Sequence, residues 1–194
     1  MQGDLHPPTP GFGHVQRGLD VDGVILVTGI PGSGKTTVAR LLTQRFPLVA
    51  HLEGDAIQSL IVSGGLHPDR EPHDGAMRQL RLRTRNVSLL ADSFAANGVL
   101  PVIDDFIPGR RLGDYLSDLQ TRPVRLIVLA PSLEVTERRD ALRPEKTVFG
   151  IWAHLEAEFR ETLQGRGLWL DTSNLAAHET VSRALERLDE AVIA

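Results

Sequence analysis

The sequence contains no cysteine. It therefore has no disulfide framework, no zinc–thiolate or iron–sulfur site and no cysteine nucleophile. Basic residues are not in excess either, because 21 of them stand against 25 acidic residues, for a formal net charge of −4. A general nucleic-acid binder usually carries a strongly basic face, and aromatic residues for stacking make up only 5% of this chain. We therefore expect no nucleic-acid partner.

Long apolar runs are also missing. No run approaches the roughly 20 apolar residues of a membrane span, and the first twenty residues lack the apolar stretch of about 7–15 residues found in a secretory signal. We expect a cytoplasmic protein without a membrane partner. Residues 1–20 are rich in proline and glycine, and we interpret them as an N-terminal tail before one domain at residues 21–194. The sequence leaves open whether the protein is a monomer or a homodimer.

Beyond the tail, short apolar runs alternate with helical patterns. We predict strands at 24–28, 48–52, 99–103, 125–129 and 168–170, and helices at 37–45, from about 55, and at 74–97, 110–120, 132–142, 150–164 and 177–192. Alternating strands and helices imply right-handed crossovers, and hence a parallel sheet covered on both faces. Ligands of such sheets bind outside the carboxyl ends of the strands.

A complete glycine-rich phosphate-binding motif follows the first predicted strand. It reads Gly29-Ile30-Pro31-Gly32-Ser33-Gly34-Lys35-Thr36, with Thr37 after it. Its glycines let several backbone N–H groups turn toward one anion, and the helix that begins near Lys35 adds its positive dipole end. Lys35 can reach the β- and γ-phosphates, and the Thr36 hydroxyl can join the ligands of Mg²⁺. We expect a P-loop NTPase fold, a three-layer α/β/α sandwich whose five parallel strands are ordered 2-3-1-4-5.

Other sequence features narrow the class of nucleotide-using protein. The guanine-reading Asn-Lys-x-Asp segment of GTPases is absent, and so is the signature helix of transporter ATPases. Motor and remodelling ATPases are usually larger than this chain of 194 residues. A small kinase is favoured, in which the fold supplies the phosphate site and the loops supply the acceptor site.

Acidic residues stand at the ends of the second and third predicted strands, as Glu53-Gly54-Asp55 and Asp104-Asp105. Phosphoryl transfer needs a carboxylate to accept the proton of the acceptor hydroxyl, and another carboxylate can hold Mg²⁺ through water. We predict Asp55 as the base, with a helix N-cap as its alternative role, and Asp104 as a metal-side or acceptor-orienting residue. Because neighbouring strand residues point to opposite faces, at most one of Asp104 and Asp105 faces the nucleotide.

Four short segments together resemble one family of kinases. They are the phosphate loop, Leu52-Glu53-Gly54-Asp55, Val102-Ile103-Asp104-Asp105-Phe106 and Leu170-Asp171-Thr172. Their order and spacing are similar to those of P-loop small-molecule kinases of the chloramphenicol phosphotransferase and tunicamycin-resistance type, which have an adenylate-kinase-like fold. The resemblance implies ATP as the donor, a small hydroxyl-bearing acceptor, and Asp55 as the base for that hydroxyl. The resemblance also implies that Lys35 and Thr36 have the same roles as the matching residues of the family's phosphate loop.

The resemblance leaves the acceptor open. An antibiotic or a nucleoside-like compound is our first hypothesis, with antibiotic resistance as the implied role. The alternatives are a metabolic kinase for a sugar, a nucleoside or a nucleotide, and an ATP-gated binding protein that sequesters its ligand without phosphorylating it.

Arginines of the later helices suggest a lid. Arg139 and Arg143 lie four residues apart and share one helical face. In similar kinases this region closes over the transferring phosphate, so the resemblance implies a lid near 138–150 in which both arginines are catalytic. The alternative is a solvated helix face. Lys146, the only lysine besides Lys35, is interpreted as a surface residue, with a lid contact as the alternative. The segment Asp171-Thr172-Ser173-Asn174 either borders the adenine or caps the last helix.

The long predicted helix at 74–97 has two contrasting stripes. One is basic and is interpreted as solvated, with an acceptor-side wall as the alternative: Arg78, Arg81 and Arg85. The other is expected to form the core face: Leu80, Val87, Leu90 and Phe94. The loop before this helix, with His67 and His73, is a candidate cap for the acceptor pocket. The histidines of the chain show no ligand-type spacing, so we predict no histidine metal site.

Overall fold

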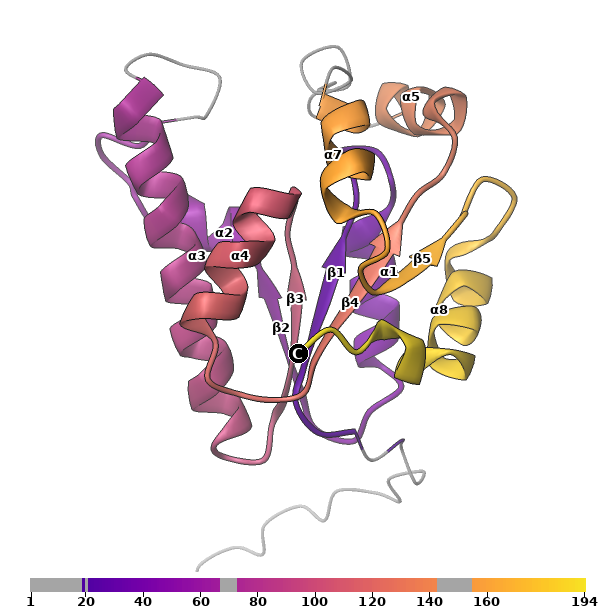
Figure 1. Ribbon diagram of the computed structural model, residues 1–194, viewed down its shortest axis with the longest axis horizontal. Coiled ribbons are helices and arrows are strands. Elements are labelled where there is room, and N and C mark those ends of the chain that lie inside the picture. The colour runs from indigo at the N-terminus through magenta and orange to yellow at the C-terminus, as the bar shows by residue number, and fades with distance from the viewer. Residues whose placement is uncertain (1–18, 20, 67–72, 143–154) are drawn as a thin grey trace, which may run out of the picture.

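The computed structural model describes residue 19 and residues 21–66, 73–142 and 155–194. Most of the predicted tail, residues 1–18 and 20, therefore lies outside the described residues. The strands are β1 (Val24–Thr28), β2 (Val49–Glu53), β3 (Leu100–Asp104), β4 (Val124–Leu129) and β5 (Leu168–Leu170). They form one sheet in the order β2-β3-β1-β4-β5, with every neighbouring pair parallel (Figure 1). The predicted strand order is confirmed.

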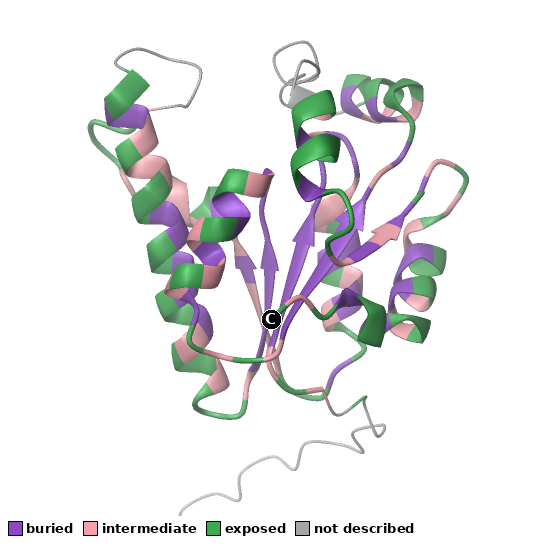
Figure 2. Ribbon diagram, viewed as in Figure 1, coloured by how far each residue is buried: buried purple, intermediate pink, exposed green. Residues whose placement is uncertain are grey.

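Three strands in the middle of the sheet are buried along their whole length. Every residue of β1, β3 and β4 is buried, whereas the edge strand β2 is mostly intermediate (Figure 2). Sequences such as Val24-Ile25-Leu26-Val27 suit this position because a parallel sheet is covered on both faces. The carboxyl ends of these three strands consequently sit on a rigid, close-packed base.

Helices cover both faces of the sheet. They are α1 (Lys35–Thr43), α2 (Gly54–Ser59), α3 (His73–Ala95), α4 (Gly109–Asp118), α5 (Leu133–Ala141), α7 (Leu155–Leu163) and α8 (Ala177–Glu186), followed by a 3₁₀ turn at Leu188–Ala191. Buried side chains of α3, α4 and α7 pack on one face, and those of α1 and α8 pack on the other. This arrangement confirms the three-layer α/β/α sandwich. In the part of the chain that the structure describes, no helix is both long enough and apolar enough to span a membrane.

Helix α3 presents a different face to the core from the one we predicted. Val87 is buried as expected, but Leu90 and Phe94 are 40% and 37% exposed. The residues that α3 buries beside Val87 are instead largely polar or small: Arg83, Thr84, Ser88 and Ala91. The helix is rotated toward this polar stripe because Arg83 and Thr84 have buried bonding partners, which offset the cost of removing them from water.

The basic stripe of α3 is exposed, in agreement with the solvated interpretation. Arg78, Arg81 and Arg85 all lie on the surface. Arg81 forms ion pairs with Asp118 and, at 3.4 Å, with Asp114 of α4. Arg81 therefore also contributes to the contact between α3 and α4.

The loop after β3 is tied to the end of β1. The backbone N–H of Ile107 donates to the Thr28 hydroxyl at 2.9 Å, and the N–H of Asp105 donates to the carbonyl of Val27 at 3.3 Å. Thr28 directly precedes the phosphate loop. The two adjacent aspartates at the end of β3 are thereby held beside that loop.

Candidate active site

The phosphate loop joins β1 to α1 in a backbone conformation that requires glycine. Gly32 and Gly34 have φ angles of 86° and 90°, which residues with a Cβ rarely adopt. A Cβ at Gly29 would lie 2.4 Å from the Ser33 hydroxyl oxygen and 2.7 Å from the Leu129 carbonyl oxygen. Gly34 is the N-cap of α1, so Lys35 and Thr36 occupy its first turn. A helix N-terminus of this form favours a bound phosphate.

Asp104, the last residue of β3, faces the phosphate loop and is 4% exposed. Burial raises the pKa of its carboxyl group, and the charge of Lys35 and the hydroxyl of Thr36 partly offset that rise. His51 lies on the same side, with its Nε2 3.9 Å from Asp104 Oδ2. Asp104 Oδ1 is buried and has no hydrogen-bond partner among the described residues. The fold thus brings together Lys35, Thr36 and Asp104, the three residues predicted for the phosphates and the metal.

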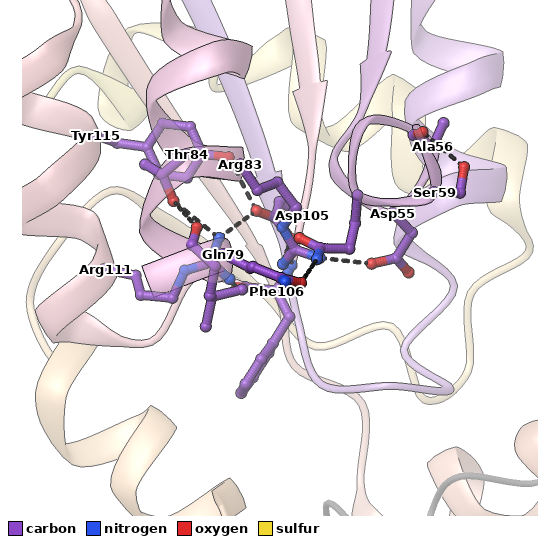
Figure 3. A network of polar contacts seen from close by, with 12 residues as sticks. Asp55, Ala56, Ser59, Gln79, Arg83, Thr84, Asp105, Phe106, Arg111 and Tyr115 are labelled. Atoms are coloured by element: carbon purple, nitrogen blue, oxygen red, sulfur yellow. Dashed lines mark hydrogen bonds and ion pairs between the residues drawn. The ribbon is translucent and has the colours of Figure 1, made fainter. Parts of the chain in front are cut away.

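Asp55 lies in the first turn of α2, at the end of β2. The N-cap of this helix is Glu53, so the predicted alternative that Asp55 acts as an N-cap is wrong. The Asp55 side chain is 93% exposed, and its Oδ1 accepts a hydrogen bond of 2.9 Å from Arg83 Nη1 (Figure 3). An exposed carboxylate at the carboxyl edge of the sheet is accessible to a ligand.

The Asp105 side chain points away from that of Asp104, toward α3 and α4, and the residue is 2% exposed. Its Oδ1 accepts from Arg83 Nη2 at 2.7 Å, and its Oδ2 accepts from Arg111 Nη2 at 2.6 Å and from the Tyr115 hydroxyl at 2.9 Å (Figure 3). Burial acts to raise its pKa, but the charges of Arg111 and Arg83, together with these hydrogen bonds, hold the pKa below its ordinary value. Asp105 is therefore a buried carboxylate that joins α3 and α4 to the sheet.

Arg139 of α5 connects the phosphate loop with the segment after β5. Its Nη2 donates to the Thr172 carbonyl at 2.9 Å, and its Nη1 donates to the Ser33 carbonyl at 3.4 Å. Burial and the neighbouring Arg138 lower its pKa. The N-cap of α8 is Ala176, so the predicted alternative that residues 171–174 cap this helix is wrong. The guanidinium of Arg139 thus holds the two loops together.

The rest of the predicted lid stays a prediction. Residues 138–142 belong to the end of α5 and its C-cap, whereas Arg143, Lys146 and the lid up to 150 lie outside the described residues. His67 does so too, and His73 is the exposed first residue of α3.

Sequence reasoning missed Arg83, Arg111 and Tyr115. A signal for Arg83 was present, because it lies four and eight residues before Val87 and Ala91, in the apolar phase of α3 rather than in its basic stripe. Arg111 and Tyr115 are likewise four residues apart on α4. What the pattern could not show is that all three side chains meet Asp105.

Comparison with known proteins places the chain in a family. Residues 25–150, more than half of the chain, match the family described as AAA domain, and the chain belongs to this family. A probable adenylyl-sulfate kinase of Aeropyrum pernix is 28% identical over 134 residues, which cover 65% of this chain and 66% of that protein. A UPF0200 protein of the same organism is 38% identical over 58 residues, covering 30% of this chain and 31% of that protein. The chain thus matches about one third to two thirds of these relatives' lengths.

Solved structures show the same fold. A sugar kinase from Janibacter has a TM-score of 0.67 and 21% identity, covering 88% of this chain and 96% of that one. The tunicamycin resistance protein of Deinococcus radiodurans has a TM-score of 0.62 and 21% identity, with 90% and 99% covered. These likenesses confirm the predicted P-loop kinase fold and its resemblance to tunicamycin-resistance proteins.

Proposed function

We propose that this member of the AAA-domain family is an ATP-dependent kinase that transfers the γ-phosphoryl group to a hydroxyl of a small molecule. One observation carries the proposal: the complete phosphate loop and the exposed carboxylate of Asp55 open at the same edge of one parallel sheet. The names of the related proteins, an adenylyl-sulfate kinase and a sugar kinase among them, support the class of reaction.

The donor site is proposed at residues 29–37. Backbone N–H groups of the loop and Lys35 bind the phosphates of ATP. The chain also fits a magnesium ion, because the Thr36 hydroxyl is a suitable ligand and the buried Asp104 Oδ1 lacks a hydrogen-bond partner in the described chain. Among residues 21–66, 73–142 and 155–194, no cluster of three or more acidic, histidine or cysteine side chains could hold a metal. A magnesium ion held by Thr36, and by Asp104 directly or through water, would supply positive charge that offsets the charge developing on the phosphate.

The transfer step assigns separate tasks to the residues. Asp55 accepts the proton of the acceptor hydroxyl, and the acceptor oxygen forms a bond to the γ-phosphorus. The bond from that phosphorus to the β–γ bridging oxygen breaks, and ADP leaves with the electron pair. Lys35 stabilises the charge that develops on the phosphate oxygens. Arg139 holds the phosphate loop through Ser33, and Arg143 is assigned to the lid near 138–150.

The acceptor is proposed to be an antibiotic or a nucleoside-like compound, in line with the tunicamycin-resistance likeness. A sugar or a nucleotide is the alternative, supported by the Janibacter and Aeropyrum proteins. ATP turnover is measured as ADP release with a panel containing chloramphenicol, tunicamycin, nucleosides, sugars and adenylyl sulfate. We expect one class to gain the mass of one phosphoryl group. Tight binding without any mass gain would instead support the ATP-gated binding protein.

The role of Asp55 is tested by Asp55→Asn. Loss of the base should lower kcat for transfer by about 10²–10⁴-fold, while ATP binding measured by calorimetry stays within about twofold of wild type. Asp189→Asn is the matched control, since Asp189 also lies exposed in the first turn of a helix but belongs to the 3₁₀ turn. Full transfer by the Asp55→Asn enzyme would refute the assignment of the base.

A further inference from the structure

The proposed base, Asp55, has an exposed side chain that the phosphate loop does not hold in place. Its side chain is 93% exposed, and an exposed carboxylate has several rotamers available. A general base has to be held within hydrogen-bond reach of the proton that it removes. Another residue must therefore restrict Asp55, and Arg83 Nη1 contacts its Oδ1 at 2.9 Å.

Arg83 is suited to this task because it is immobilised itself. Its side chain is 9% exposed, and its Nη2 donates to Asp105 Oδ1 at 2.7 Å. Asp105 is in turn held by Arg111, by Tyr115 and by the backbone N–H of Phe106, which donates to Oδ1 at 2.8 Å. One planar guanidinium thus bridges a fully buried carboxylate and an exposed one (Figure 3).

The backbone around Asp55 is fixed against the same buried carboxylate. A Cβ at Gly54 would lie 2.6 Å from Asp105 Cγ, so the residue before Asp55 must be glycine for α2 to approach so closely. Gly54 is buried, whereas Asp55 beside it is exposed. Asp105 therefore determines the position of the main chain at Gly54 directly, and that of the Asp55 side chain through Arg83.

We propose that Arg83 is a positioning residue, which bridges Asp105 and Asp55 and holds the Asp55 carboxylate toward the acceptor hydroxyl. This inference rests on the proposed role of Asp55 as the base. The proposal assigns Arg83 to the base and not to an anionic group of the acceptor, because its side chain is 9% exposed and its Nη1 and Nη2 each donate to one carboxylate. Its effect is on the rate of transfer and not on the binding of either substrate.

A double-mutant cycle with Arg83→Gln and Asp55→Asn tests the inference. Transfer is measured with the panel compound that gains the most phosphoryl mass or, if none does, with water as the acceptor through ADP release. Arg83→Gln should lower kcat by about 10–100-fold, since a small misplacement of a catalytic group has effects of this size. The KM for ATP should stay within about twofold of wild type. In the Asp55→Asn background, the same substitution should change kcat by less than about twofold, because residues that act as a unit are non-additive.

Two further variants keep the test valid if Arg83→Gln unfolds. Arg83→Lys retains the charge beside Asp105, but an ammonium cannot bridge both carboxylates as a planar fork does, so we expect an intermediate kcat and a native circular dichroism spectrum. Arg81→Gln is the matched control, because Arg81 lies on the same helix and pairs with Asp118 and Asp114 of α4. We expect it to keep the wild-type kcat.

The possible failures are distinguishable. If Asp55→Asn keeps the full rate, the assignment of the base is wrong, and the positioning role falls with it. If Asp55→Asn is slow but the effects of the two substitutions multiply in the double variant, Arg83 acts independently of Asp55, and the positioning role alone is overturned. A wild-type kcat for Arg83→Lys would overturn it as well.

Discussion

Asp104 and Asp105 are neighbours in the chain, yet their carboxylates face opposite sides of the sheet and meet opposite environments. Asp104 lies beside Lys35 and Thr36, and burial leaves its pKa raised. Asp105 is the more deeply buried of the two, yet two arginines and a tyrosine hold its pKa lowered. Burial therefore sets the direction of the shift for Asp104, whereas the charged and hydrogen-bonding partners set it for Asp105.

The two sides are also built differently. The proposed nucleotide side is largely one continuous segment, in which glycine conformations and a helix N-terminus shape the backbone. The proposed acceptor side is assembled from side chains of α2, α3, α4 and the loop after β3. A phosphate site can therefore be recognised as a motif, whereas the surroundings of the base depend on contacts between distant segments.

The largest effect is expected on the nucleotide side, from Lys35→Ala. Removing the charge that stabilises the transferring phosphate should lower kcat by at least about 10²–10³-fold. Calorimetry should also show weaker ATP binding. Arg45→Ala, which removes an exposed basic side chain just beyond the far end of α1, is the control and should keep the wild-type rate. Equal losses in both variants would contradict the separate role of Lys35.

The acceptor side should show the largest loss of stability. Asp105→Asn leaves the guanidiniums of Arg83 and Arg111 buried without their carboxylate, which typically costs about 3–5 kcal/mol of the free energy of unfolding. Urea unfolding at constant m-value measures the loss. Asp118→Asn is the matched control, because Asp118 also joins α3 to α4 but its partner Arg81 is 43% exposed. That pair should contribute no more than about 1 kcal/mol.

The opposite pKa shifts predict opposite dependences of stability on pH. The pKa of Asp105 is lowered on folding, so its stabilisation is present above its ordinary pKa of about 3.9 and is lost as the pH falls through the lower folded value. The unfolding free energies of wild type and Asp105→Asn should converge in strong acid. An unchanged difference between pH 7 and the acid limit would show that Asp105 stabilises through packing instead of charge.

The smallest effect on stability is expected from Asp104→Asn. The pKa of Asp104 is raised on folding, so its ionised carboxylate lowers the free energy of unfolding at neutral pH. This destabilisation disappears as the pH falls through the raised pKa of the folded state toward the ordinary pKa of about 4. The variant should be slightly more stable than wild type at pH 7, by much less than the change for Asp105→Asn. Turnover should need about 10–100-fold more Mg²⁺ for half-maximal rate, as for other groups that hold a metal indirectly. A loss of stability would contradict the pKa shift.

Most of the architecture could be predicted from local patterns. Short β-branched runs and intervening helical periods indicate the five strands and their helices, and the observed bounds differ by one or two residues in most of them. The orientation of α3 could not be predicted in this way. Leu90 and Phe94 look like core residues, but the buried partners of Arg83 and Thr84 determine which face of the helix turns inward.

For the site, the sequence was sufficient for the phosphate loop because a continuous motif encodes its own backbone shape. It also placed carboxylates at the ends of β2 and β3. It favoured Asp104 for the nucleotide side but could not settle which of Asp104 and Asp105 faces it, and it could not find Arg83, since these depend on which segments meet at one edge of the sheet. Arg83 meets Asp55 across 28 residues and Asp105 across 22, and pairings over such separations are specified by packing and not by spacing in the chain.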